Sequence, residues 1–231
     1  MARSIPIILL LLLAAGACGL PRDADGTLER VRGGTLRVGV VIDTPWVTEG
    51  PGGAAGGIEG AMVAELAARL HARPEWVHAT EAEMMEALKS RELDLVIGGL
   101  TAKSPYGREI AFTRPYYTDT VAIGATAGSP AEVLKGRYVA VKAGDPAAAE
   151  VRKKGATPVN VPDLKTAPQG LMAAPTWQLQ ALALRRTGVT LHQHKHVMAV
   201  APGENAFLVE VERFLDARRG RVPGLLRRAA R

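Results

Sequence analysis

The chain has 231 residues, of which 47% are hydrophobic and 23% are charged, the balance of a globular protein and not of a disordered one. A chain of this length forms one ordinary domain or two small lobes. The single cysteine excludes an internal disulfide and a cysteine-rich zinc site. The net charge of +6 is concentrated in residues 213–231, which hold seven arginines and one acid, Asp216. Such a segment faces an anionic membrane or acidic partner, or is the solvated basic face of a terminal helix.

Residues 1–17 have the features of a signal peptide. Arg3 is followed by an apolar run from Ile5 to Ala15, which is too short to span a bilayer. The stretch Leu13-Ala14-Ala15-Gly16-Ala17-Cys18 resembles the bacterial lipobox. The resemblance implies cleavage before Cys18, a diacylglycerol on its sulfur and a membrane-anchored protein in the periplasm or at the cell surface. The alternative is ordinary cleavage nearby, which leaves Cys18 as a free thiol.

The segment that follows the cysteine is polar and rich in glycine and proline. We expect residues 18–33 to form a tether between the lipid and the folded part. No other run is long and apolar enough to cross a membrane.

Strand and helix patterns alternate through the next part of the chain. Apolar runs predict strands over 36–42, 74–78 and 94–100. Helical spacing from Met62 to Leu70 predicts one helix, and Thr80 with Glu83 predicts a capping box at the start of another. This alternation predicts an α/β fold with a parallel sheet.

A similar alternation then restarts. Ser129-Pro130-Ala131-Glu132 predicts a helix start, and Asp145-Pro146 predicts another, which Gly155 ends. The remaining predictions are strands over 138–143, 157–161 and 170–174, a helix over 177–184, and a last helix that Asn205 caps and Gly220 ends.

The order of these elements and several short motifs resemble the bacterial extracellular solute-binding proteins of family 3, which have the type II periplasmic-binding fold. The motifs are Leu36-Arg37-Val38-Gly39-Val40, Thr44-Pro45-Trp46, Gly57-Ile58-Glu59, residues 93–101, residues 108–117 and residues 134–144. The resemblance implies a two-lobed α/β protein with an interlobe cleft, in which a small polar solute is trapped by a hinge motion. It places residues 34–122 and 197–231 in lobe 1, and a shortened lobe 2 at residues 127–193. It also implies an inner-membrane ABC-type importer as partner.

Three positions depart from the amino-acid-binding members of that family. Tyr106 stands where an arginine holds the ligand carboxylate, Asp145 stands where a threonine follows Ala-Gly, and Thr176 stands near the place of an aspartate that takes the ligand amine. The resemblance therefore supports the fold, and a cationic, neutral or aromatic solute is as well supported as an amino acid.

The candidate ligand-binding residues follow predicted strands or begin predicted helices: Trp46, Thr101, Lys103, Tyr106, Arg108 and Asp145. Each also has a plain structural interpretation. Trp46 is equally well interpreted as a loop aromatic that packs on lobe 1. Asp145 is interpreted first as a helix cap. Trp177 is assigned to the core.

His192, His194 and His196 alternate along a predicted extended segment, which puts the three imidazoles on one face about 6–7 Å apart. Two of them with a further ligand could bind a divalent metal, or they could make closure pH-sensitive. The alternative is a solvated strand edge.

We therefore predict a monomeric, exported solute-binding lipoprotein without a cofactor or nucleic-acid partner. The alternatives are a sensor or partner-binding lipoprotein, a metal-binding lipoprotein, and an enzyme on the same scaffold. Against an enzyme, the sequence contains no Gly-x-Ser-x-Gly, His-Glu-x-x-His or phosphate-loop motif, and it ends soon after Gly220.

Overall fold

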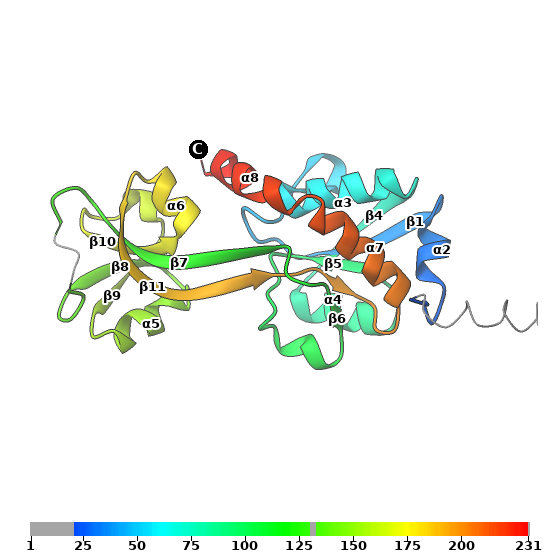
Figure 1. Ribbon diagram of the computed structural model, residues 1–231, viewed down its shortest axis with the longest axis horizontal. Helices are drawn as coiled ribbons and strands as arrows, with labels where there is room; N and C mark the ends of the chain where they lie inside the picture. The colour runs from blue at the N-terminus through cyan, green and yellow to red at the C-terminus, as the bar shows by residue number, and fades with distance from the viewer. Residues whose placement is uncertain (1–20, 130–132, 231) are drawn as a thin grey trace, which may run out of the picture.

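The computed structural model describes residues 21–129 and 133–230, which form two lobes joined by a pair of long strands (Figure 1). Each lobe is built on its own five-stranded sheet. The signal peptide and Cys18 lie outside the described residues, as does most of the helix start expected at residues 129–132. No helix in the described ranges is long and apolar enough to cross a membrane.

The sheet of lobe 1 has the order β4-β1-β5-β12-β6. Its first three strands are parallel: β4 (Arg73–His78), β1 (Thr35–Val40) and β5 (Leu95–Ile97). The antiparallel strands β12 (Ala199–Val200) and β6 (Ala111–Phe112) complete it. All three residues of β5 are buried, as expected for an apolar central strand covered on both faces.

Helices cover both faces of this sheet. They are α3 (Gly57–Arg69), α4 (Glu81–Lys89), α7 (Asn205–Asp216) and α8 (Val222–Ala229). The expected inward face of α3 is buried. The capping box of α4 forms as predicted: the Glu83 amide donates to Thr80 Oγ1, and the Glu83 carboxylate accepts from the Thr80 amide.

The sheet of lobe 2 has the order β11-β7-β10-β8-β9. Its strands are β7 (Tyr117–Ala125), β8 (Tyr138–Lys142), β9 (Thr157–Val161), β10 (Leu171–Pro175) and β11 (Arg185–His196). Helix α5 (Ala147–Lys153) packs in one apolar cluster with alternate residues of β7, and α6 (Thr176–Ala181) packs in another. The two helices therefore cover opposite faces of the sheet.

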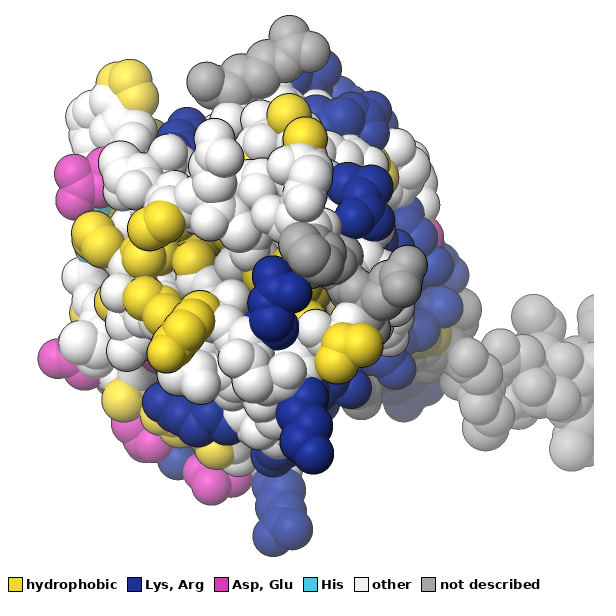
Figure 2. Space-filling model, turned by 90° about the vertical axis from the view of Figure 1, so that its left-hand side faces the viewer, with side chains coloured by type: hydrophobic (Ala, Val, Ile, Leu, Met, Phe, Trp, Pro, Cys, Tyr) yellow, Lys and Arg dark blue, Asp and Glu magenta, His cyan; other side chains and the backbone are white. Residues whose placement is uncertain are grey.

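Short elements complete the described chain: α2 (Thr27–Val31), β2 (Thr48–Glu49), η2 (Pro51–Gly53), β3 (Ala55–Gly56), η3 (Pro105–Arg108), η4 (Leu164–Thr166) and η5 (Arg219–Arg221). Element η4 lies between β9 and β10 in lobe 2. Viewed from the end of lobe 2, most Lys and Arg side chains lie toward the right-hand side, and Asp and Glu lie toward the left (Figure 2).

Strands β7 and β11 connect the lobes. They pair antiparallel from Tyr117 opposite His196 to Ala125 opposite Arg185, with irregular register between Arg186 and His192. Both run from lobe 1 into the sheet of lobe 2 (Figure 1). Any movement of one lobe relative to the other must bend this hydrogen-bonded pair.

Part of the segment expected to form a tether, residues 18–33, is folded against lobe 1. Residues 27–31 form α2, and both Thr27 and Val31 are buried. The Asp23 carboxylate accepts hydrogen bonds from the amides of Leu28 (2.7 Å) and Phe207 (2.9 Å). Asp23 thereby caps α7, so Asn205 is not the cap: it is the first helical residue after Glu204, and Gly220 lies beyond the end of α7.

Candidate functional site

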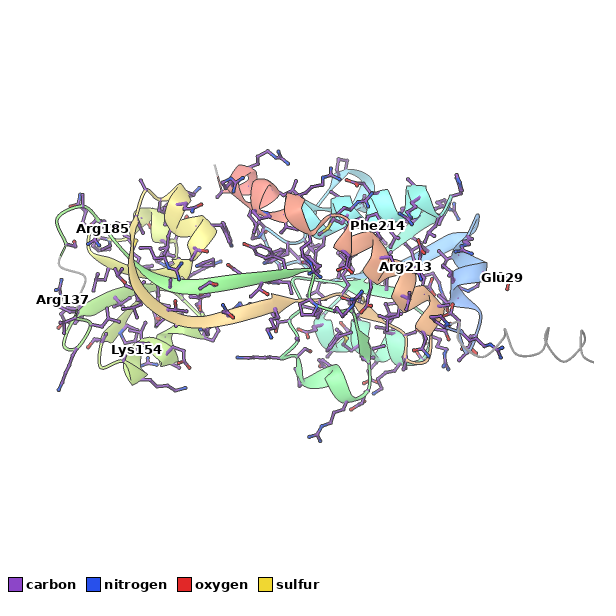
Figure 3. All side chains as sticks on the ribbon, viewed as in Figure 1. Glu29, Arg137, Lys154, Arg185, Arg213 and Phe214 are labelled. Carbon is purple, nitrogen blue, oxygen red and sulfur yellow. The ribbon has the colours of Figure 1, made fainter. Side chains whose placement is uncertain are left out.

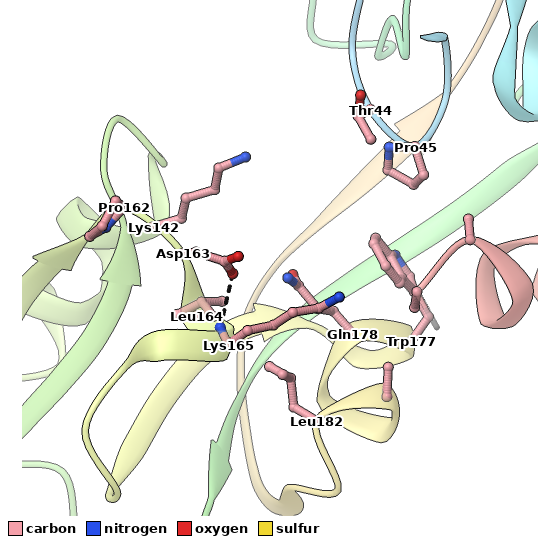
Figure 4. Close-up of a pocket in the computed structure, with 13 residues that line it drawn as sticks. Thr44, Pro45, Lys142, Pro162, Asp163, Leu164, Lys165, Trp177, Gln178 and Leu182 are labelled. Carbon is pink, nitrogen blue, oxygen red and sulfur yellow. Dashed lines mark hydrogen bonds between the residues drawn. The ribbon is translucent and has the colours of Figure 1, made fainter.

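A cavity of about 290 Å³ lies between the lobes (Figure 4). Lobe 1 contributes Thr44 and Pro45 from the loop after β1, and the last residues of α8. Lobe 2 contributes Lys142, the segment 162–165, and Trp177 with its neighbours on α6. Because parallel strands end at this edge of each sheet, loops from both lobes converge here.

Charged side chains of lobe 2 extend into this space. Lys142 points toward the Thr44–Pro45 loop, and Lys165 extends toward Gln178 and Trp177 (Figure 4). Desolvation raises the pKa of Asp43, in the loop after β1, and the ammonium group of Lys142 opposes that rise. The attraction between Lys142 and Asp43 acts across the cleft and favours its closure.

Asp119, on β7 between the lobes, is 3% exposed. Its Oδ2 accepts a hydrogen bond of 3.2 Å from the indole Nε1 of Trp177, and its buried Oδ1 has no partner among the described residues. Desolvation raises the pKa of this carboxyl, and the Trp177 hydrogen bond opposes the rise. His194 lies directly opposite Asp119 on β11.

An aromatic stack joins the loop after β1 to the connecting strands. The rings of Trp46 and His196 lie 3.8 Å apart between centroids, and Tyr117 lies 5.8 Å from Trp46. Trp46 is buried in the lobe 1 core, where it contributes to packing. Desolvation lowers the pKa of His196 to about 4, and the neighbouring His194 adds to the effect. The His196 imidazole is therefore neutral at pH 7.

Glu59 fixes the loop that follows β5. Its Oε2 accepts from the amides of Gly98 (2.8 Å) and Gly99 (3.0 Å), and its Oε1 accepts from the Tyr116 hydroxyl (2.5 Å). Burial raises the Glu59 pKa to about 6, and these three hydrogen bonds oppose the rise. Gly99 has a φ of +64°, and a Cβ there would collide with Asp43 and Trp46, so glycine is required.

A separate cavity of about 490 Å³ brings together several expected site residues. Thr101 and Lys103 line it from lobe 1, and His192 and His194 line it from β11. The rings of His192 and His194 lie 4.6 Å apart between centroids, whereas His194 and His196 lie 6.2 Å apart.

The expected metal centre does not form in this arrangement. Across residues 21–129 and 133–230, no group of three or more His, Cys, Asp or Glu side chains is placed to hold a metal ion. Desolvation lowers the pKa of both His192 and His194, and Lys103 adds to the lowering in each case. Both shifts favour the neutral form of the His192 and His194 imidazoles.

The remaining expected residues serve other purposes in this conformation. Tyr106 packs against the apolar cluster of α4 and β5, away from the cavities. Arg108 is exposed on η3 and lines none of the described cavities. Asp145 lies two residues before the first residue of α5, whose N-cap position is Pro146, and its Oδ1 accepts a hydrogen bond from the Ala147 amide at 2.7 Å.

Comparison with protein-family models identifies this architecture. The model for bacterial extracellular solute-binding proteins, family 3, matches residues 36–220. The chain belongs to this family. No curated protein sequence matches the chain.

Solved structures share the fold of this family 3 protein. An ancestral cationic amino acid solute-binding protein, AncCDT-1, is 20% identical with a TM-score of 0.70, covering 87% of this chain and 98% of its own. The L-cystine solute receptor of Neisseria gonorrhoeae, in an unliganded open conformation, is 17% identical with a TM-score of 0.67, covering 84% and 91%. The second substrate-binding domain of a putative amino acid ABC transporter from Streptococcus pneumoniae is 17% identical with a TM-score of 0.65, covering 84% and 97%.

Several cleft residues of this solute-binding protein were not found from its sequence. Trp177 was assigned to the core, yet it both packs against lobe 1 and lines the cavity. Lys142, Lys165 and Arg227 carried no local signal, because each is an ordinary surface cation in its own segment. Only the approach of the two lobes places these side chains around one space.

Proposed function

We propose that this family 3 solute-binding protein captures a small polar solute between its lobes and delivers it to an inner-membrane ABC-type permease. The observation that carries the proposal is a cavity whose walls come from both lobes, with Pro45 on one side and Lys142 and Trp177 on the other. A solute that contacts both walls binds the closed state more tightly than the open one, so binding favours closure.

The solute is not restricted to α-amino acids in this proposal, although the names of several structural relatives refer to them. Tyr106 packs against an apolar cluster, and Asp145 occupies the start of α5 with its own carboxylate. Neither position offers a cationic anchor for a carboxylate. Recognition must therefore use other groups of the cleft.

We also propose that the mature protein is held at a membrane by lipid on Cys18. Because Asp23 already belongs to the folded body, only residues 19–22 separate that cysteine from lobe 1. Four extended residues span at most about 14 Å. A Cys18→Ser variant expressed in a bacterial host should move from the membrane fraction to the soluble periplasmic fraction, and unchanged fractionation would contradict lipid anchoring.

The experiment that tests solute binding follows thermal unfolding of residues 19–231 against amino acids, amines, aromatic acids and divalent metals, with and without chelator. A ligand at 100 times its dissociation constant adds about 2.7 kcal/mol, which shifts Tm by several degrees. A saturable shift from one organic class supports the proposal. A shift only with metals, abolished by chelator and by His194→Ala, would replace it with a metal-binding role, and conversion of the solute to product would replace it with an enzyme. No shift from any class would contradict solute capture.

A further inference from the structure

A second cavity, of about 520 Å³, lies where α6 of lobe 2 approaches α8 of lobe 1. Trp177 and Gln180 line it from α6, and Lys165 lines it from η4. Arg227 and Ala230 line it from the end of the chain. It adjoins the first cavity, because Trp177, Lys165 and Ala230 line both.

The charge around this second cavity has one sign. Lys165 and Arg227 are both exposed, and neither forms an ion pair within the part of the chain that the structure describes. Among residues 21–129 and 133–230, no carboxylate side chain lines the second cavity. The first cavity adds Lys142 and one acid, Asp163, whose Oδ1 already accepts from the Lys165 amide at 2.9 Å.

The position of Arg227 follows from how α8 packs. Val222 and Leu226 are buried in the lobe 1 core, which leaves Arg227 on a different face of the helix. In Figure 1, α8 reaches from lobe 1 toward α6 of lobe 2. The charge of Arg227 also affects Tyr117, on the connecting strand β7. Desolvation and Asp119 raise the pKa of Tyr117, and the guanidinium group of Arg227 opposes this rise.

Arg227 forms no ion pair among the described residues, whereas three other arginines of the basic C-terminal segment do. Arg218 and Arg221 pair with Glu65, and Arg219 pairs with Asp216. These three guanidinium groups are neutralised by neighbouring carboxylates of lobe 1. Arg227 instead directs its charge toward the space beside α6.

A guanidinium group, an ammonium group and an indole ring around one cavity suit an organic anion. Charge-assisted hydrogen bonds from arginine and lysine bind carboxylates, and an indole face packs against a flat apolar group. We propose that Arg227 of lobe 1 and Lys165 of lobe 2 together bind the carboxylate of an aromatic organic acid whose ring packs beside Trp177. This inference rests on the proposed solute-binding function and assigns its solute class.

Binding of an anion at this place is coupled to movement of the lobes. When the cavity is empty, Lys165 and Arg227 are like charges on opposite lobes, and their repulsion opposes approach of α6 to α8. A carboxylate between them replaces that repulsion by two attractions. The ligand anion therefore favours the closed arrangement.

The test uses residues 19–231 and isothermal titration with benzoate, phenylacetate and indole-3-acetate at constant ionic strength. The amides of these acids, benzylamine and inorganic phosphate serve as comparison ligands. Arg227→Gln and Lys165→Gln each remove one proposed contact. Arg228→Gln and Lys154→Gln are matched controls, because they make the same charge change at exposed positions that line neither cavity, and Lys154 lies at the distant part of lobe 2 (Figure 3).

We expect saturable binding of a carboxylate that weakens about tenfold or more in Arg227→Gln and in Lys165→Gln, and less than twofold in the two controls. Arg227→Lys should restore part of the affinity. Equal losses in all four variants would show a long-range charge effect and overturn the assignment. Equally tight binding of phosphate would overturn the organic ligand, and binding of benzylamine or of the amides alone would overturn the anion while leaving solute capture intact. No binding of these probes together with no shift in the wider thermal screen would overturn both proposals.

Discussion

The indole Nε1 of Trp177, on α6, donates a hydrogen bond of 3.2 Å to Oδ2 of Asp119, on β7. This bond joins the ligand cavity to the strands that connect the lobes, because Trp177 lines the cavity and Asp119 lies on a connecting strand. The other oxygen of Asp119, Oδ1, is buried and has no hydrogen-bond partner among the residues that the structure describes. A change at the cavity wall therefore alters the hydrogen bonding of the connecting strands.

Trp177→Phe should destabilise the protein by about 1–3 kcal/mol, because it leaves both oxygens of a buried carboxyl group unpaired. The pKa of Asp119 should rise further, since the hydrogen bond that now lowers it is lost. Chemical denaturation measures the first effect, and NMR titration of the carboxyl carbon measures the second. In an Asp119→Leu background the same Trp177 substitution should cost clearly less, and an equal cost in both backgrounds would assign the effect to packing alone.

His196 makes the folded state sensitive to acid. Burial lowers its pKa from 6.5 to about 4, and neither ring nitrogen has a hydrogen-bond partner among the described residues. Because the folded-state pKa lies below the unfolded value, its contribution is present above pH 6.5 and is lost as the pH falls toward 4. The full contribution is about 3 kcal/mol.

His196→Phe should remove this loss, so the variant should keep more of its stability between pH 6.5 and pH 4 than the wild type does. The measurement is urea denaturation across that range. His78→Phe, on β4 outside the aromatic stack, is the control and should follow the wild-type profile. If both variants lose stability as the wild type does, His196 is not the acid-sensitive group.

Glu59 has the opposite dependence. Burial raises its pKa from 4.5 to about 6, so its contribution is fully present below pH 4.5 and is lost as the pH rises through 6. The loss is about 2 kcal/mol, and it partly offsets the gain from His196 over the same interval. Glu59→Gln should therefore show a steeper gain of stability between pH 4.5 and pH 6.5 than the wild type. Parallel pH profiles for variant and wild type, measured by urea denaturation, would show that Glu59 does not titrate in this interval.

Sequence patterns predicted those helices and strands whose formation depends on residues close together in the chain. The apolar runs at β1, β5 and β8 and the Thr80–Glu83 capping box depend on residues close in sequence, and the structure confirms them. The ligand cavity depends instead on the approach of segments far apart in the chain. Lys165 and Arg227 line the same cavity because α8 packs on lobe 1 and reaches α6. The spacing of residues within either segment does not predict this approach.

The same reason explains why the sequence did not predict the ordered part of the N-terminal segment. Residues 18–33 are polar and contain glycine and proline, so their composition is that of a tether. The hydrogen bonds that order this segment come from 177 to 184 residues away: Glu204 accepts from the Thr27 amide, and Asp23 accepts from the Phe207 amide. The amino-acid composition of such a segment indicates that it is polar. It does not indicate whether groups far away in the chain form hydrogen bonds with it.

Asp23→Ala tests whether this docking contributes to stability. The substitution removes the acceptor for the amides of Leu28 and Phe207 at the starts of α2 and α7, and loss of a helix cap costs about 0.5–2 kcal/mol. Since one carboxylate serves two helices, we expect a loss of about 1–3 kcal/mol in the free energy of unfolding, measured by urea denaturation. Asp25→Ala is the matched control: its side chain forms a partly exposed ion pair with Arg91 at 2.5 Å, which is worth about 0–1 kcal/mol. Equal, small losses in the two variants would show that residues 23–33 behave as a tether in solution, and a clearly larger loss for Asp23→Ala would establish them as part of lobe 1.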